Sequence, residues 1–345
     1  MCAADHETLG KLSHSVKSTE WRTSVLLACR AFWVAVRWMT LAVMVWQWPV
    51  AHAASDEAAR AIAVIYPDIG EPYRSVFSTI IGGIEGQTKS RIASFPVGAN
   101  PNTQDLSNEL RRRDIRAVIA LGRNGLKVAS SLDRNLGIVA GGVLSVPESD
   151  AQNLSVHSLA PDPALLFAKL KTLVPSARRV IVVYDPRQNA WLIKLAREAA
   201  KAQGLELQAF EAEDLKTATR QYQDSLSSAD PKRDVLWLPQ DSTTVDETAV
   251  LPLVLQEAWN RNLAVFSSSA AHVKRGALFS LYPNNVELGK ALAAWAMGYV
   301  SSGTAIRGVR PLKEVLVAVN TRTANHLGIN LNALQQRFDM VFPEP

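Results

Sequence analysis

Short apolar runs alternate with amphipathic segments over residues 61–319, and this alternation most constrains the fold. The clearest run is VIVVY at residues 180–184, where every side chain is apolar and most are β-branched. A strand that is apolar on both faces is typical of a parallel sheet, because helices cover both faces of such a sheet. The segments between the runs have helical spacing. The pattern therefore predicts an α/β chain with parallel sheets covered by helices.

The alternation divides into two units of similar plan and about equal size. In the first unit we predict strands at 61–66, 117–121 and 137–143 and helices at 72–86, 102–113 and 124–132. The second begins near Pro161, with Asp162 and Pro163 as N-cap and first turn of a helix. Its predicted strands are 180–184, 206–210, 234–238, 263–267 and 278–282, with helices at 190–203, 215–228 and 249–260. A helix at 285–302, a strand at 314–319 and a helix at 321–327 complete the chain.

Residues 1–53 have the composition of a secretory signal. Arg30 and Arg37 precede the apolar run 38–48, and AHA at 51–53 is a small-x-small cleavage site. We predict export to the periplasm after cleavage behind Ala53. An uncleaved anchor is less favoured, because an arginine at the bilayer centre costs about 2.5–3.5 kcal/mol. Lipidation at Cys29 is also less favoured, because only four apolar residues precede this cysteine. Translation could start downstream of Met1, and this alternative stays open.

Composition and charge indicate a globular protein. The chain has 345 residues, 48% apolar and 20% charged, and both cysteines, Cys2 and Cys29, lie in the leader. Residues 54–345 contain 32 Lys and Arg residues and 29 Asp and Glu residues. This net charge of +3 is mild and evenly scattered, so we predict no nucleic-acid partner.

No catalytic or cofactor motif stands out. The serines at 267–269 lie close to His272, but the chain has no GxSxG, and a serine and histidine so near in sequence rarely form a triad. We predict serines that line a cleft and a His272 at the surface. No HExxH, P-loop or GxGxxG occurs, so neither metal nor nucleotide cofactor is expected. Asp185 and Asp241 could be an acid/base pair, but helix caps are the favoured interpretation.

The loops after the predicted strands are rich in hydroxyls, amides and glycines. In two neighbouring α/β units, a ligand is expected between the carboxyl ends of the strands. These loops are 67–71, 122–125, 185–189, 239–242 and 267–269. Tyr73, just past the first loop, could stack on a ring, whereas Trp237 lies within an apolar strand and is expected in the core.

Three segments carry a resemblance to a known family: DVLWLPQDSTT, AVFSSSAAHVKRGALFSLYPNNVELGKALAAWAMGYVSSGT and VAVNTRTANHLGINL. In order and spacing they resemble the ABC-transport substrate-binding proteins, in the group that includes tryptophan- and tyrosine-type binders. The resemblance implies a type I periplasmic binding fold, with two Rossmann-like lobes and three interlobe crossings near 145–159, 280–284 and 306–313. The implied lobes are 54–155 with 284–305, and 156–283 with 306–345.

The resemblance also implies ligand contacts at the strand-end loops. Carried over by position, they are Gly122, Arg123 and Asn124 on the first lobe, Asp185, Asp241, Ser242, Ser267 and Ser268 on the second, and Tyr282 near the hinge. Arg123 departs from the small hydroxylated residue usual in the family. A guanidinium at a helix N-terminus favours an anionic ligand group. The alternative is that Arg123 points to solvent and pairs with a neighbouring acid.

The function expected from this resemblance is solute binding without catalysis. A monomeric, exported protein would capture a small polar or anionic, amino-acid-like molecule and deliver it to an ABC permease in the inner membrane, with no cofactor. The alternative is a periplasmic sensory protein on the same fold that signals to a membrane receptor. An exported hydrolase is a third possibility without a supporting motif.

Overall fold

The computed structural model describes residues 57–133, 135–144, 154–304, 306–334 and 337–343. The predicted signal sequence and its alternatives lie outside these residues. Within them, no helix combines the length and the apolar character that a membrane crossing requires.

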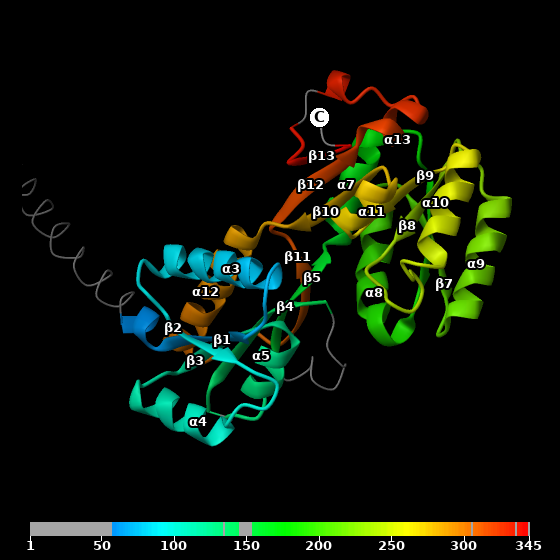
Figure 1. Cartoon of the computed structure of the whole chain (residues 1–345). Helices are drawn as coiled ribbons and strands as arrows, with labels where there is room; N and C mark the ends of the chain where they lie inside the picture. The colour runs from blue at the N-terminus through cyan, green and yellow to red at the C-terminus, as the bar shows by residue number, and fades with distance from the viewer. Residues whose placement is uncertain (1–56, 134, 145–153, 305, 335–336, 344–345) are drawn as a thin grey trace, which may run out of the picture. The chain divides into compact units, whose positions relative to one another are not determined.

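The first sheet has six parallel strands in the order β11-β5-β4-β3-β1-β2 (Figure 1). Its strands are β1 (Ile62–Pro67), β2 (Ala93–Val97), β3 (Ala117–Leu121), β4 (Gly137–Val143), β5 (Ser155–Pro161) and β11 (Gly308–Leu312). Its helices are α3 (Tyr73–Thr88), α4 (Thr103–Arg112), α5 (Gly122–Ala129) and α12 (Asn285–Ser302). Side chains of α3 and α12 pack on one face of this sheet and those of α4 and α5 on the other.

The second sheet has seven strands in the order β13-β12-β10-β9-β8-β6-β7, and β12 runs antiparallel to β10. The strands are β6 (Arg179–Tyr184), β7 (Glu206–Glu211), β8 (Asp234–Leu238), β9 (Ala264–Ser267), β10 (Phe279–Pro283), β12 (Val315–Asn320) and β13 (Met340–Phe342). The helices are α7 (Pro163–Leu173), α8 (Pro186–Ala202), α9 (Leu215–Ser228), α10 (Val250–Asn260), α11 (Ala270–Arg275) and α13 (Thr321–His326), with a 3₁₀ turn at Asn332–Leu334.

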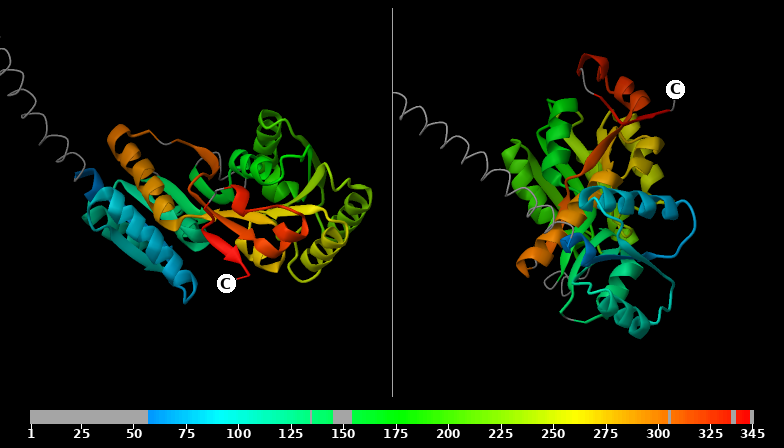
Figure 2. Two further views of the ribbon diagram at one scale, coloured as in Figure 1. Left: turned by 90° about the horizontal axis from the view of Figure 1, so that it is seen from above. Right: turned by 90° about the vertical axis from the view of Figure 1, so that its left-hand side faces the viewer.

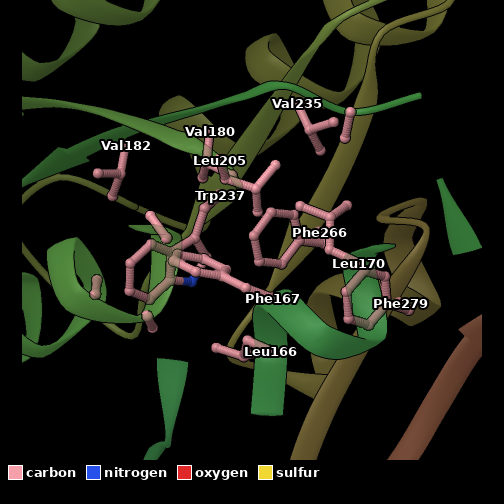
Figure 3. Packing of buried hydrophobic residues seen from close by; sticks show 14 of the residues in the cluster. Leu166, Phe167, Leu170, Val180, Val182, Leu205, Val235, Trp237, Phe266 and Phe279 are labelled. Carbon is pink, nitrogen blue, oxygen red and sulfur yellow. The ribbon is translucent and has the colours of Figure 1, made fainter. Parts of the chain in front are cut away.

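Aromatic side chains organise the core on one face of the second sheet (Figure 3). The rings of Trp237 and Phe266 are parallel, with centroids 6.2 Å apart, and Phe279 stacks on Phe266 at 5.2 Å. Phe167 of α7 meets the Trp237 ring edge-on at 5.7 Å. The prediction that Trp237 belongs to the core is therefore confirmed.

Local sequence signals explain several element ends. The Asp162 carboxylate accepts the Ala164 backbone N–H and begins α7, as the Asp-Pro pair predicted. The Asn102 side chain likewise accepts two N–H groups at the start of α4. Gly204 has φ of 63°, which a glycine adopts at little cost after the end of α8.

The fold class is as predicted: the chain passes between the two sheets three times, after β5, after β10 and between β11 and β12 (Figure 2). Residues 155–161 and 308–312 were expected in connections or in the second lobe, yet β5 and β11 pair with each other in the first sheet. Four strands, β2, β5, β11 and β13, were not predicted, and β2, β11 and β13 lie at the edges of their sheets. Edge strands bury one side only, so their apolar signal is weak.

Candidate functional site

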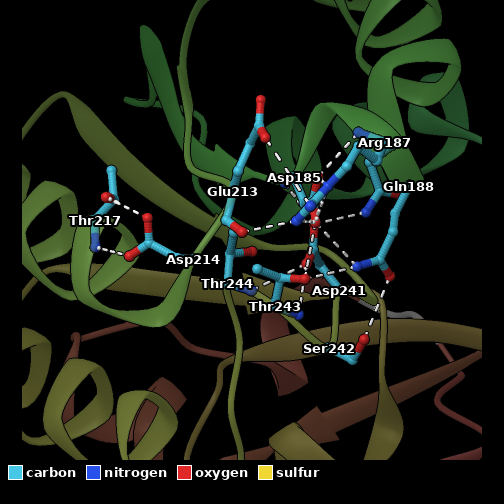
Figure 4. Close-up of polar contacts among 11 residues, drawn as sticks. Asp185, Arg187, Gln188, Glu213, Asp214, Thr217, Asp241, Ser242, Thr243 and Thr244 are labelled. Atoms are coloured by element: carbon cyan, nitrogen blue, oxygen red, sulfur yellow. Dashed lines mark hydrogen bonds and ion pairs between the residues drawn. The ribbon is translucent and has the colours of Figure 1, made fainter.

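The loops after β6 and β8 form one hydrogen-bond network at the carboxyl edge of the second sheet (Figure 4). The two strands are adjacent and parallel, so their carboxyl ends lie side by side. Asp185 follows β6 directly, and Asp241 follows β8 after two residues. Both carboxylates are buried, with 1% and 5% relative exposure.

The Asp241 carboxylate accepts four hydrogen bonds from the protein itself. Its Oδ1 accepts the backbone N–H groups of Thr243 and Thr244, each at 3.0 Å. Its Oδ2 accepts the Asp185 backbone N–H at 2.7 Å and the Asn189 amide at 2.9 Å. Four donors occupy the lone-pair capacity of a carboxylate. Asp241 therefore joins the two loops and has little capacity left for a ligand.

Asp185 is similarly occupied. Its Oδ1 accepts the Arg187 backbone N–H at 2.9 Å, which caps α8, and its carboxylate also receives the Arg187 guanidinium. Oδ2 accepts the Thr243 hydroxyl at 2.8 Å. The Arg187 hydrogen bond, aided by those from Thr243 and Gln188, holds the pKa of Asp185 well below its usual range. The favoured prediction of a helix cap is confirmed for Asp185.

The exposed side chains at this edge are the neutral Ser242, the cationic Arg187 and the acidic Glu213, whose carboxylate lies 4.0 Å from the Arg187 guanidinium. Ser242 is exposed, and its hydroxyl donates a long 3.4 Å hydrogen bond to Gln188 Oε1. The Gln188 amide donates to the Thr243 hydroxyl at 2.9 Å. The Arg187 guanidinium also donates to the Glu213 carbonyl at 2.7 Å. Among the predicted ligand residues of the second sheet, Ser242 is the exposed one.

Ser267, at the end of β9, is fully buried beside His272. Its Oγ lies 3.1 Å from the Leu238 carbonyl, 3.0 Å from the Ser269 N–H and 2.8 Å from His272 Nδ1. A hydroxyl has one proton, so donation to Leu238 and acceptance from Ser269 and His272 satisfies all three contacts. This assigns the proton to His272 Nδ1. The pair is then a structural hydrogen bond, because the imidazole donates to the serine and does not accept its proton.

The prediction that His272 lies at the surface is wrong, since the residue is 5% exposed. Residues 270–275 form the helix α11, which is not among the helices predicted from the sequence. The helical turn brings His272 back over the end of β9. Burial lowers the pKa of His272 and favours its neutral form.

The other two predicted residues of this region are at least half-buried. Ser268 is 1% exposed, and its Oγ accepts the Trp237 indole N–H at 3.0 Å. Tyr282 lies on β10, and desolvation raises the pKa of its phenol. A ligand role for Ser267, Ser268 and Tyr282 stays a prediction, and the hydrogen bonds of the two serines are made within the protein.

The first sheet presents a different set of side chains. Gly122 follows β3 with φ of 69°, and Arg123 and Asn124 lie exposed in the first turn of α5. Neither side chain makes a hydrogen bond or ion pair with any other residue that the structure describes. Tyr73, at the start of α3, is 62% exposed. Because β1 and β3 are parallel neighbours, the two loops follow the same edge of the sheet.

Sequence reasoning missed the side chains that hold the network together, namely Arg187, Asn189, Thr243 and Thr244. The segment DSTT at 241–244 carried a usable signal, because an Asp two and three residues before free N–H groups forms an Asx turn. Arg187 contacts Asp185 from two residues away, whereas Asn189 contacts Asp241 across a sequence separation of 52 residues. In the described parts of the chain, no cluster of three His, Cys, Asp or Glu could hold a metal ion.

A family model described as ABC transporter substrate binding protein matches residues 167–338. This segment contains the Asp185 and Asp241 network and all of α11. No curated protein matches the chain.

Solved structures share the fold at low sequence identity. A ligand-free, open substrate-binding protein with adhesive properties from Clostridium difficile has a TM-score of 0.58 and 16% identity, over 81% of this chain and 98% of that one. An ABC domain in complex with L-Trp from Streptococcus pneumonia has a TM-score of 0.50 and 16% identity, over 81% and 100%. A conserved domain protein from Vibrio cholerae has a TM-score of 0.50 and 17% identity, over 81% and 99%. These similarities establish the two-sheet architecture of the type I periplasmic binding proteins.

Proposed function

Because the chain belongs to the ABC transporter substrate-binding protein family, we propose that it is an exported solute-binding protein. It captures a small polar or anionic, amino-acid-like molecule between two lobes built on the two sheets and delivers it to a permease in the inner membrane. The Asp185 and Asp241 network carries this proposal. Both carboxylates are occupied by protein donors, which suits a rigid binding surface better than an acid/base site.

The second lobe contributes a preformed polar surface in this proposal. Asp241 accepts hydrogen bonds from four groups in two segments, 185–189 and 243–244, so the loops that carry Ser242 and Gln188 keep one conformation before a ligand arrives. A preformed site avoids the entropic cost of ordering loops on binding. Ser242 and Gln188 supply neutral hydrogen-bonding groups, which fit the polar part of an amino-acid-like ligand.

The first lobe contributes the preference for an anion. Arg123 lies in the first turn of α5, where unpaired backbone N–H groups and the helix dipole favour negative charge. Its guanidinium is exposed and makes no ion pair with a described residue. A ligand carboxylate would therefore find a free planar donor pair at this position.

Lobe closure follows from the same contacts. Groups on both lobes can touch one small molecule together only in the closed state. A ligand shifts the equilibrium between open and closed forms by its difference in affinity for the two. Delivery then requires only that the permease recognise the closed form, and no reaction at the ligand is involved.

A thermal-shift screen tests ligand capture. The purified protein is heated with amino acids, aromatic acids and small anions, each in large excess. A true ligand at one hundred times its Kd stabilises the fold by about 2.7 kcal/mol. Calorimetry on every hit separates specific binding from general salt effects. If no compound of these classes raises Tm, capture of an amino-acid-like solute is wrong.

Uptake of the identified ligand tests delivery. Cells that lack the protein should accumulate the labelled ligand more slowly, and the wild-type gene should restore the rate. Normal uptake in these cells, together with tight binding by the purified protein, would contradict delivery and favour the sensory alternative.

A further inference from the structure

A cavity of about 670 Å³ lies apart from the strand-end loops of the candidate site. Its walls come from α11, the last turn of α10, the end of β12, the start of α13 and the end of β13. Asn320, in its floor, bonds to Leu278 just before β10 begins. Ligand sites for small molecules have volumes of roughly 300–1,000 Å³, so the size suits a small organic compound.

The cavity is lined by three cationic side chains. Arg275 pairs with Glu247 at 3.9 Å and donates to the Glu247 carbonyl at 2.8 Å. Lys274 and Arg322 have no ion pair with an acidic residue in the described part of the chain. Two positive charges with no acidic partner therefore face one concave surface. Such a surface attracts an anion, and a concave wall screens the attraction less than a flat one does.

One wall of the cavity is apolar and is held in place by ring contacts. Trp259 stacks on His326 with ring centroids 3.7 Å apart and planes 6° apart, and the His326 ring bonds to the Trp259 carbonyl at 3.0 Å. The Arg322 guanidinium lies 5.6 Å from the Trp259 ring centre. Phe342 and Pro343 complete this apolar wall. An apolar wall next to cations is the lining that an anion with a hydrophobic part requires.

Hydrogen bonds secure the floor without using the cations. The Asn320 amide donates to the Val273 carbonyl at 2.8 Å and its oxygen accepts the Thr323 N–H at 2.9 Å. The Thr323 hydroxyl donates to the Gly276 carbonyl at 2.9 Å. The floor is satisfied by protein contacts, so Lys274 and Arg322 are the groups left for a ligand.

We propose that this cavity binds a small organic anion, whose carboxylate or phosphate contacts Lys274 and Arg322 while its apolar part packs against Trp259 and Phe342. The site is distinct from the interlobe site. It shares α11 with the Ser267 and His272 pair, so an occupant would also stabilise that helix.

Fluorine NMR of the fluorotryptophan-labelled protein tests this proposal, with the Trp259 signal assigned by Trp259→Phe. The probes are benzoate, phenylphosphate, neutral benzyl alcohol and inorganic phosphate. Benzoate or phenylphosphate should shift the Trp259 signal in a saturable way, and the tighter of the two identifies the anionic group. The double variant Lys274→Glu, Arg322→Glu should weaken this binding about tenfold or more.

The controls keep the test decisive. Lys201→Glu reverses a distant exposed lysine on α8 and should leave the titration unchanged. Lys274→Gln with Arg322→Gln, checked for an unchanged Tm, replaces the charge reversal if that variant does not fold. The proposal is overturned if no anion gives a saturable shift, if benzyl alcohol or inorganic phosphate binds as tightly as the organic anions, or if neither double variant weakens binding.

Discussion

The two sheets present their strand-end loops in opposite ways. In the second sheet, the acids after β6 and β8 are buried and bonded to backbone and side-chain donors. In the first sheet, Asp68 after β1 and Arg123 after β3 are exposed and have no side-chain partner among the described residues. The second surface is therefore held by contacts within the protein, whereas the exposed side chains of the first would gain contacts from a ligand under the proposed function. We infer that affinity depends on both lobes but that charge selectivity lies in the first.

The largest expected effect is on stability, from Asp241→Ala. The change leaves buried donors on Asp185, Thr243, Thr244 and Asn189 without their acceptor, and each unsatisfied buried donor costs about 1–3 kcal/mol. Since the loop can relax toward water, we expect the free energy of unfolding to fall by about 3 kcal/mol. Urea denaturation followed by circular dichroism measures it.

Asp68→Ala is the matched control, because it removes a strand-end acid from the other sheet. Its carboxylate is exposed, so the expected change is within about 0.5 kcal/mol. Equal effects of the two variants would show that the loops of the two sheets do not differ in the way described.

The second effect depends on pH and concerns a buried histidine of the first sheet. His157 on β5 packs edge-on against Trp295 at 4.0 Å, faces Arg310 of the neighbouring strand, and its Nε2 has no hydrogen-bond partner among the described residues. Burial and Arg310 lower the pKa of His157 to about 4. The unfolded chain, with the ordinary value of 6.5, binds the proton first. The contribution of neutral His157 to the free energy of unfolding is therefore fully present above pH 6.5 and is lost as the pH falls toward about 4.

Between pH 7 and pH 5 this histidine should cost about 2 kcal/mol of unfolding free energy. His272 in the second sheet, with its pKa also lowered by burial, adds to the loss in the same direction. Denaturation of wild type and His157→Gln at both pH values isolates the first contribution. If both proteins lose the same stability on acidification, His157 is not the group responsible.

The elements and contacts that could be predicted from the sequence are those that depend on neighbouring residues. The VIVVY run and the Asp162–Pro163 pair are local signals, and they placed β6 and the start of α7 correctly, whereas α8 begins at Pro186, inside the segment 185–189 that was expected to be a loop. Asp185 was predicted as a cap because a cap depends on the next few residues. The bonds from Asn189 and the Asp185 backbone to Asp241 span more than fifty residues, so no local pattern contains them.

His272 shows the same limit at short range. A serine and a histidine this close in sequence were not expected to form a triad and His272 was expected at the surface, yet one turn of α11 brings the side chains of Ser267 and His272 to 2.8 Å. The pattern after β9 contains two serines and two alanines, which are as typical of a loop as of a short helix. The helix buries Val273 against Ala277, Ala318 and Phe342, and this tertiary packing stabilises it over a loop.

The third expected effect is on affinity and lies in the first sheet. Arg123→Ala should weaken binding of the ligand found by screening about tenfold. The Tm of the free protein should stay unchanged, because the Arg123 side chain makes no hydrogen bond or ion pair with another residue that the structure describes. Isothermal titration calorimetry measures the Kd. Lys127→Ala, an exposed cation later on the same helix, should leave the Kd as it is. Unchanged affinity in Arg123→Ala would remove the anionic preference from the proposed function.

The smallest expected effect separates two serines of the second sheet. Ser242 is exposed, so Ser242→Ala should raise the Kd about threefold through one lost hydrogen bond and leave unfolding unchanged. Ser268 is buried and accepts the Trp237 indole N–H. Ser268→Ala should therefore lower the free energy of unfolding by about 1 kcal/mol and alter the Kd less than Ser242→Ala does. If Ser268→Ala instead weakens binding more and leaves stability intact, the buried serines contact the ligand, and the surface of the second lobe rearranges on binding.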